Sequence, residues 1–212
     1  MAHTDIDHLV ITSPTLEMGA QHVIDVLGVE PQPGGEHEKM GTHNLLLRLG
    51  NSTYLEVIAK NPEAPAPGRP RWFSLDRVNE GSLPLLATWV ARTTDIDATV
   101  SACPEGVGDI VSMNRGDLDW LITTPQNGEL LLDGVVPSFI EWQTAWHPAE
   151  GLVDHGLRLL GLELHHPEQE RLSGILKLVD LEGPVTVEGC RPSERPHLQA
   201  IIETPDGIRR LK

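Results

Sequence analysis

Cysteine is nearly absent from this 212-residue sequence, which holds only Cys103 and Cys190, in unrelated contexts. Two such residues cannot build the disulfide framework of a small secreted domain. The first residues, Met-Ala-His-Thr-Asp-Ile-Asp, also lack the charged start and the apolar stretch of a secretory signal. We therefore expect a cytoplasmic protein, and we assign neither cysteine a role.

Long apolar runs and clusters of basic residues are missing as well. No run approaches the roughly 20 residues that a membrane-spanning helix needs. The net charge of −15, from 31 acidic and 16 basic residues, produces a field that repels nucleic acid and anionic membrane surfaces. A Gly-x-Gly-x-x-Gly fingerprint and a phosphate-binding loop are absent too, which argues against a nucleotide cofactor. The sequence therefore predicts a small-molecule substrate or ligand as the partner.

Potentially chemical side chains are concentrated in one stretch, residues 34–59, which contains two histidines, an asparagine, a tyrosine and a strand-borne glutamate. Glu56 is the most informative residue of this stretch, because it lies in the middle of the apolar run Tyr-Leu-Glu-Val-Ile. A carboxylate inside such a strand needs a partner or a chemical task. Glu56 is therefore our candidate catalytic residue.

The first third of the chain has the pattern of one strand, one helix and a pair of strands. The helix is marked by Ser13-Pro14 at its start, an apolar stripe along one face, and Gly28 as its stop. The predicted elements are a strand at 5–12, a helix ending at 27, a Pro/Gly-rich bend at 31–35, and strands at 42–49 and 53–59.

The same pattern restarts near residue 85 and again near residue 157. Short segments match without a gap, such as Leu-Asp-Trp-Leu-Ile-Thr-Thr-Pro (118–125) with Leu-Gln-Ala-Ile-Ile-Glu-Thr-Pro (198–205). Chance similarity between short strands is the alternative. A repeated supersecondary unit explains the matches better. We predict a single body over 1–212, with modules at 5–61 and 85–143 and an abbreviated third module at 157–212.

Several short motifs, taken in order, carry a resemblance to a known family. They are Asp7-His8-Leu9-Val10, Gly34-Gly35-x-His37, Gly41-Thr42-x-Asn44, Tyr54-Leu55-Glu56, and, in the second half, Pro137-Ser138-Phe139-Ile140-Glu141-Trp142 with Trp146-His147-Pro148. In this order the chain resembles the vicinal oxygen chelate superfamily, which includes glyoxalases, extradiol dioxygenases and bleomycin-resistance proteins, and within it the glyoxalase-like proteins.

The resemblance implies an α+β fold, in which repeated βαβββ modules pair into a half-open, sheet-lined cleft with helices on the outer face. It also implies a divalent metal (Zn, Ni, Fe or Mn), with His8, Glu56 and Glu141 at the ligand positions. The first strand of the second module departs from the pattern. Thr88 or Trp89 stands there where a ligand is expected, and neither suits a divalent metal.

Apart from the resemblance, His8 and Glu56 lie on strands that can be neighbours. They could hold a metal, act as a hydrogen-bonded acid–base pair, or form a structural pair in the core. Asn44 and His43 point to opposite faces of one strand, and we favour Asn44 for the cleft. His165-His166 is read as a capping and surface feature. The predicted substrate-binding residues are His37, Asn44, Tyr54, Trp89 and Trp142.

Two classes of function follow. The first is an enzyme, a lyase, isomerase or dioxygenase that uses metal-assisted or acid–base chemistry on a small oxygenated organic substrate. The alternative is a non-catalytic protein that sequesters a small molecule in the same cleft. Modules of this kind can pair within one chain or between chains, so the sequence also leaves a homodimer open.

Overall fold

Two modules of the same topology form the larger part of the protein. The computed structural model describes residues 3–191 and 193–212. The first module consists of β1 (Thr4–Thr12), α1 (Leu16–Leu27), β2 (Gln32–His37), β3 (Thr42–Arg48) and β4 (Tyr54–Lys60). The second consists of β5 (Leu85–Thr93), α2 (Ile96–Ala102), β6 (Asp109–Arg115), β7 (Leu118–Thr124) and β8 (Ser138–Trp142). Short 3-10 turns lie between some of these elements: η1 (Glu38–Met40), η2 (Leu75–Arg77), η3 (Leu131–Gly134) and η4 (Pro148–Gly151).

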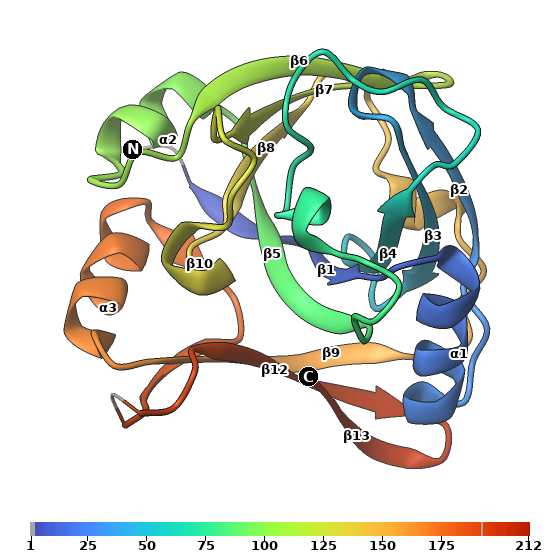
Figure 1. Ribbon diagram of the computed structural model, residues 1–212. Helices are drawn as coiled ribbons and strands as arrows, with labels where there is room; N and C mark the ends of the chain where they lie inside the picture. The colour runs from blue at the N-terminus through green and yellow to red at the C-terminus, as the bar shows by residue number, and fades with distance from the viewer. Residues whose placement is uncertain (1–2, 192) are drawn as a thin grey trace.

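Both modules order their strands in the same way, and they join edge to edge in one sheet. The sheet runs β2-β3-β4-β1-β5-β8-β7-β6, with β1 and β5 antiparallel at its centre. In each module the first and last strands are parallel neighbours, β1 with β4 and β5 with β8. The sheet curls until its two end strands, β2 and β6, approach each other (Figure 1). The predicted α+β fold with a half-open, sheet-lined cleft is confirmed.

The curl separates two apolar clusters. Val10, Ile58, Val90 and Ile140 belong to the cluster on the concave face, whereas alternate residues on the same strands belong to a larger cluster on the convex face. This division follows from the two-residue period of a strand. In the residues that the structure describes, no helix is long and apolar enough to cross a membrane.

The last quarter of the chain forms a second sheet that packs on the convex face. Its elements are β9 (Arg158–His166), α3 (Gln169–Leu178), β10 (Leu181–Glu182), β11 (Val185–Gly189), β12 (His197–Thr204) and β13 (Gly207–Leu211). In the order β11-β9-β12-β13, the first strand of this segment, β9, lies between two of its own strands, whereas β1 and β5 each lie at one end of their module. Strand β10 pairs with β1 and not with the second sheet. Leu162, Leu164 and Ile202 join the same core as Leu9. The second sheet therefore covers the back of the cleft (Figure 1).

Two local expectations in the first module need correction. Helix α1 begins at Leu16, because the Thr15 hydroxyl caps it by accepting from the Met18 N–H at 3.2 Å, two residues later than Ser13-Pro14 suggested. It ends as expected at Gly28, which takes the left-handed conformation (φ 75°). Residues 32–35 of the predicted Pro/Gly-rich bend belong to strand β2, and a proline is tolerated there because β2 is an edge strand.

Trp89 belongs to the core and not to the cleft, which corrects its prediction as a substrate-binding residue. It lies on the convex face of β5, is completely buried, and donates its indole N–H to the Val135 carbonyl oxygen at 3.0 Å. Its neighbours Thr88 and Val90 point the other way, so the alternation of strand β5 turns Trp89 away from the cleft.

The core role of Trp89 makes Trp89→Phe a test of stability. We expect the free energy of unfolding to fall by about 1–3 kcal/mol, because the buried Val135 carbonyl loses its donor. Urea unfolding measures this. Trp146→Phe is the matched control, since Trp146 is 43% exposed, and it should change stability by less than about 0.5 kcal/mol. Equal stability of the two variants would contradict the assignment.

Candidate functional site

A small cavity opens on the concave face where the two modules meet. Its volume open to the centre of a water molecule is about 20 Å³, which is room for about one water, so a larger molecule fits only if the side chains around the cavity move. The first module supplies most of its polar wall and the second most of its aromatic wall. The lining residues are His8, His37, Tyr54, Glu56, Trp72, Phe73, Arg115, Trp120, Ile122, Ile140 and Trp142.

A β-bulge in β1 brings two consecutive residues to this site. Ile6 pairs with Ala91 and His8 with Val90, so Asp7 is an extra residue without a partner on β5. The bulge shifts the alternation of the strand. Strict alternation would put Ile6 on the same face as His8. Because of the bulge, Ile6 instead joins the convex core with Leu9. Asp7 can then contact the Nδ1 side of the His8 ring.

Three buried side chains form a chain of charged contacts. Asp7 accepts from His8 Nδ1 at 2.6 Å, and the opposite ring nitrogen, His8 Nε2, lies 3.6 Å from a Glu56 carboxylate oxygen. The second oxygen of Asp7 accepts from Trp142 Nε1 at 2.8 Å and lies 3.0 Å from His147 Nε2. Asp7 is fully buried, and His8 and Glu56 are about 5% exposed.

These contacts set the protonation states. Burial alone would lower the pKa of His8, but the hydrogen bond to Asp7 and the Glu56 carboxylate raise the pKa to about 9. Burial would raise the pKa of Glu56, yet His8 and Asn44 outweigh it and hold the pKa at about 2. Asp7 follows the same rule: burial opposes ionisation, and His147 and His8 hold the pKa well below its usual range. At neutral pH, His8 is an imidazolium between two carboxylates.

Asn44 and Tyr54 complete the polar wall. Asn44 donates its side-chain amide to the second oxygen of Glu56 at 2.5 Å, and Tyr54 stacks on His8 with ring centroids 4.6 Å apart. Burial, together with the charges of Asp7 and Glu56, raises the pKa of Tyr54 well above its usual value, so its hydroxyl stays protonated. His43, on the other face of β3, lies outside the cavity.

His37 holds an arginine that sequence reasoning missed. Burial is the main influence that lowers the pKa of His37 to about 4, with the Arg115 charge acting in the same direction. The neutral ring accepts from Arg115 Nη1 at 3.4 Å through Nε2 and donates to the Thr42 hydroxyl at 3.1 Å through Nδ1. A Cβ added at Gly35 would lie 2.9 Å from Arg115 Cδ, so the glycine lets the arginine stem cross β2.

The aromatic wall comes from β7, β8 and the loop after β4. Trp120 and Trp142 lie with centroids 5.4 Å apart, and Trp72 meets the His37 ring edge-on at 5.0 Å. Phe73 and Ser74 hold positive φ values of 55° and 53°, which bulky residues adopt only when their surroundings impose them. The Trp72-Phe73 corner thus closes over the cavity.

Glu141 does not lie with His8 and Glu56, which corrects its prediction as a metal ligand. It accepts from the Ile96 N–H at 2.8 Å and from the Gln143 amide at 2.8 Å, so it caps the start of helix α2. Its neighbours Ile140 and Trp142 line the cavity instead. Aligning Glu141 with Glu56 through their aromatic-apolar-Glu motifs therefore paired residues on opposite faces.

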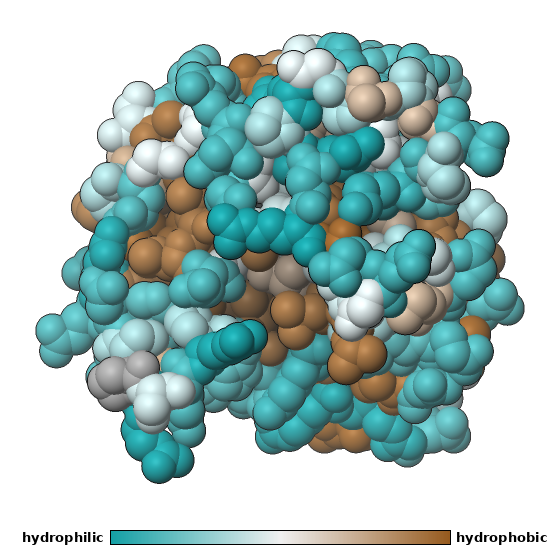
Figure 2. Space-filling model, in the orientation of Figure 1, coloured by the Kyte–Doolittle hydropathy of each residue, from teal (hydrophilic) through white to brown (hydrophobic). Residues whose placement is uncertain are grey.

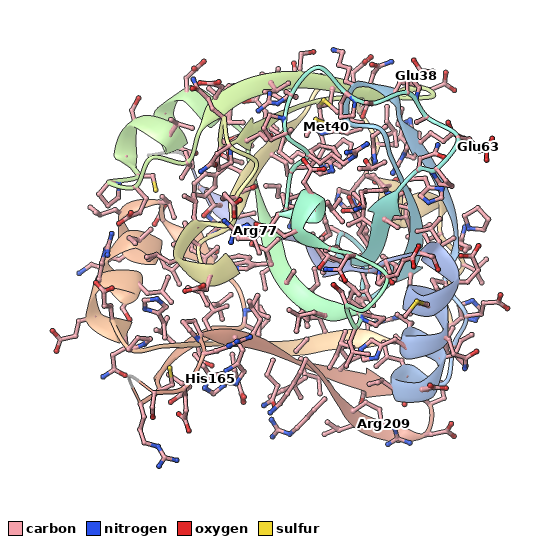
Figure 3. All side chains as sticks on the ribbon, viewed as in Figure 1. Glu38, Met40, Glu63, Arg77, His165 and Arg209 are labelled. Carbon is pink, nitrogen blue, oxygen red and sulfur yellow. The ribbon has the colours of Figure 1, made fainter. Side chains whose placement is uncertain are left out.

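Of the capping and surface feature expected at the adjacent histidines of β9, the capping part is confirmed for His166, whereas neither residue is exposed. His166 is buried and accepts from the Glu168 N–H at 3.0 Å, just before helix α3. His165 stacks on His197 with centroids 4.4 Å apart and lies on the second sheet, far from Met40 inside the curl (Figure 3). Neither belongs to the cavity.

The donor set does not fit a divalent metal. Among residues 3–191 and 193–212, no group of three or more His, Cys, Asp or Glu side chains is placed to hold one. Both nitrogens of His8 already face carboxylates, and the Arg115 cation occupies the accepting nitrogen of His37. Among the predicted ligands Glu56 alone remains at the cavity as a candidate, with one oxygen already bound by Asn44, whereas typical zinc sites have three or four protein ligands.

Comparisons with solved structures give a likeness in fold. A hypothetical protein from Staphylococcus aureus is 13% identical over 99% of this chain and 98% of its own, with a TM-score of 0.59. Methylmalonyl-CoA epimerase from Mycobacterium tuberculosis is 19% identical over 64% of this chain and 86% of its own, with a TM-score of 0.41. A variant of the Streptomyces coelicolor methylmalonyl-CoA epimerase, in complex with 2-nitronate-propionyl-CoA, is 14% identical over 68% of this chain and 100% of its own, with a TM-score of 0.45. These likenesses are too distant to transfer an activity.

The search of curated proteins found no match to the chain. The comparison with family models did find one. The model of the glyoxalase-like domain family matches residues 6–179, which span both modules and extend to the end of α3. The predicted resemblance to glyoxalase-like proteins is confirmed: the chain belongs to the glyoxalase-like domain family.

Proposed function

We propose that this protein is an acid–base enzyme that moves a proton on a small oxygenated substrate, as an isomerase or lyase does. One observation carries the proposal: a buried imidazolium, His8, and a buried carboxylate, Glu56, face the same cavity 3.6 Å apart. Pairs of groups whose surroundings drive their pKa values apart are typical of acid and base partners. Here the separation runs from about 2 to about 9.

The two groups have complementary tasks. A substrate carbonyl oxygen accepts from His8 Nε2, which stabilises the negative charge that develops there when a neighbouring C–H is lost. Glu56 accepts that proton. Since the substrate oxygen then competes for the His8 proton, Glu56 loses part of its ion pair, and burial raises its pKa toward the value of an effective base.

The surrounding residues position this pair. Asp7 fixes the orientation of the His8 ring through Nδ1 and stabilises its charged form, as a carboxylate does behind a catalytic histidine. Asn44 holds one oxygen of Glu56 and leaves the other toward His8. Neither residue lines the cavity, so both are positioning residues. A dioxygenase reaction, by contrast, would require a redox metal that the donor set does not suit.

The aromatic wall favours a second candidate, a binding protein without chemistry. Trp72, Trp120 and Trp142 offer flat apolar surfaces of the kind that hold small ligands. The same wall would also shield a proton transfer from water, so proton exchange decides between the two functions.

Glu56→Gln should abolish proton exchange. We expect the wild type to incorporate deuterium next to the carbonyl of at least one member of a panel that includes 2-oxobutyrate and 2-butanone. The variant should be slower by about 10²–10⁴-fold, since it lacks the base. Proton NMR in deuterated water measures the rate.

Glu141→Gln is the matched control for that experiment, because Glu141 is a strand glutamate on the face away from the cavity. It should exchange at the wild-type rate. If tryptophan fluorescence shows that a compound binds while no compound exchanges, the acid–base function is refuted in favour of the binding protein.

Stability should fall as pH rises through the alkaline range. The pKa of His8 is raised from 6.5 to about 9 in the folded protein, so its contribution is complete below pH 6.5 and is lost as pH approaches 9. The expected loss over this range is about 3 kcal/mol. Urea unfolding at a series of pH values measures the free energy of unfolding, and NMR titration of the histidines measures the pKa of His8.

The exposed His155 provides the control for this pH dependence. His155→Asn should follow the wild-type curve. A stability that stays level between the two pKa values, with a His8 resonance that titrates near 6.5, would contradict the imidazolium assignment.

A further inference from the structure

Arg115 stands at the open seam of the curled sheet. The end strands β2 and β6 approach each other there, but among the described residues no backbone ladder joins them. Two side chains bridge the seam: Lys39 donates to the Ser112 carbonyl oxygen at 2.8 Å, and Arg115 donates to His37 at 3.4 Å. Arg115 lines both the inner cavity and an outer groove beside Gly35, Gly116 and Trp146.

The guanidinium of Arg115 has donors to spare. In the part of the chain that the structure describes, its hydrogen bond goes to the neutral His37, and no carboxylate lies within ion-pair distance of it. A guanidinium presents five N–H donors in a planar fork that matches a carboxylate. Held by a neutral ring beside a cavity, this half-buried fork has no anionic partner among the described residues.

Trp72, which lines this cavity and a neighbouring one beside Thr88 and Thr124, adds a second unused donor. The residue is 4% exposed and lines the cavity, yet its indole N–H has no hydrogen-bond partner among the described residues. A buried N–H without an acceptor destabilises the fold, so native proteins rarely keep one without a reason. An acceptor that arrives with a ligand would satisfy it.

We propose that the ligand of this cavity is a small carboxylate, whose carboxyl group is held by Arg115 with the Trp72 indole N–H as a further donor. The inference rests on the proposed function, because it places the reacting carbonyl at His8 and Glu56 and the carboxylate at the seam. It names the class of substrate, a small organic acid with an oxygen function near its carboxylate.

Charge favours the seam over the inner end of the cavity for such a group. Asp7, His8 and Glu56 together carry one net negative charge at neutral pH, which repels an anion from the inner end of the cavity. The outer groove also carries Glu36, Glu38 and Asp117. Between these acids, the Arg115 cation is the point at which a carboxylate is stabilised, and this fixes which end of the substrate enters.

The test compares acids with amides of the same shape. Benzoate with benzamide, and 2-oxobutyrate with 2-oxobutyramide, are titrated against the full chain by tryptophan fluorescence. At least one acid should bind tenfold or more tightly than its amide, since a charge-assisted bidentate pair contributes about 1.5–3 kcal/mol. Arg115→Met should remove the preference, and Arg115→Lys should keep part of it.

Two further variants make the result specific. Arg195→Met replaces an exposed arginine next to β12, on the second sheet, and should leave the preference unchanged. Trp72→Phe keeps the ring but loses the N–H. It should weaken acid binding by about 2–10-fold without lowering the free energy of unfolding, because the N–H has no partner to lose. If the indole N–H had only a structural role, Trp72→Phe would lower the free energy of unfolding and leave acid binding unchanged.

The outcomes separate this inference from the proposed function. Equal binding of acid and amide, no binding of either pair, or a preference that survives Arg115→Met would overturn the carboxylate inference. Deuterium exchange of 2-butanone as fast as that of 2-oxobutyrate would leave the acid–base function intact while the inference fails. Preferential acid binding that Arg115→Met abolishes, without any exchange, would support the inference and refute the acid–base function.

Discussion

The Asp7 carboxylate is the contact on which the site depends. It is completely buried, and a buried charge is tolerated only when it is well partnered. Its donors come from three parts of the chain: His8 from β1, Trp142 from β8, and His147 from the turn before η4. One ionised group therefore joins both modules and holds His8 in its charged form.

The two modules share a topology but divide the work of the cavity. The concave face of the first carries His8, Tyr54 and Glu56, whereas that of the second carries Ile140, Trp120 and Trp142. The second sheet covers the convex side and leaves the cavity face free. In the view of Figure 2 hydrophilic residues cover most of the surface, and apolar surface gathers around a central hollow. A duplicated fold has thus become asymmetric, with chemical groups on one half and an apolar wall on the other.

The sequence predicted the order of the units and half of the site, and the reasons for its failures are physical. His8, Glu56, Asn44 and His37 could be identified because polar residues inside apolar strands are conspicuous. Strand β2 was not recognised, because it contains a proline and two glycines, which an edge strand tolerates. Strand β6 was not recognised either, although it contains Ile110, Val111 and Met113. Asp7 and His147 stood in the motifs that carried the resemblance, but no pattern in the sequence announces a bulge. Arg115 ends a strand beside a Gly-Asp turn, where an arginine is usually a surface residue. Only the curl of the sheet brings it to His37.

The bulge at Asp7 makes the site depend on a count of residues as well as on their identity. In a regular strand, removing one residue turns every following side chain to the other face. The extra residue of β1 is Asp7 itself, so a chain that lacked it would lose both the bulge and the carboxylate that holds His8. Relatives of this protein should therefore be compared by the register of β1 against β5 as well as by the Asp-His motif. Two chains with the same motif, one in a bulged strand and one in a regular strand, would present different side chains to the cavity.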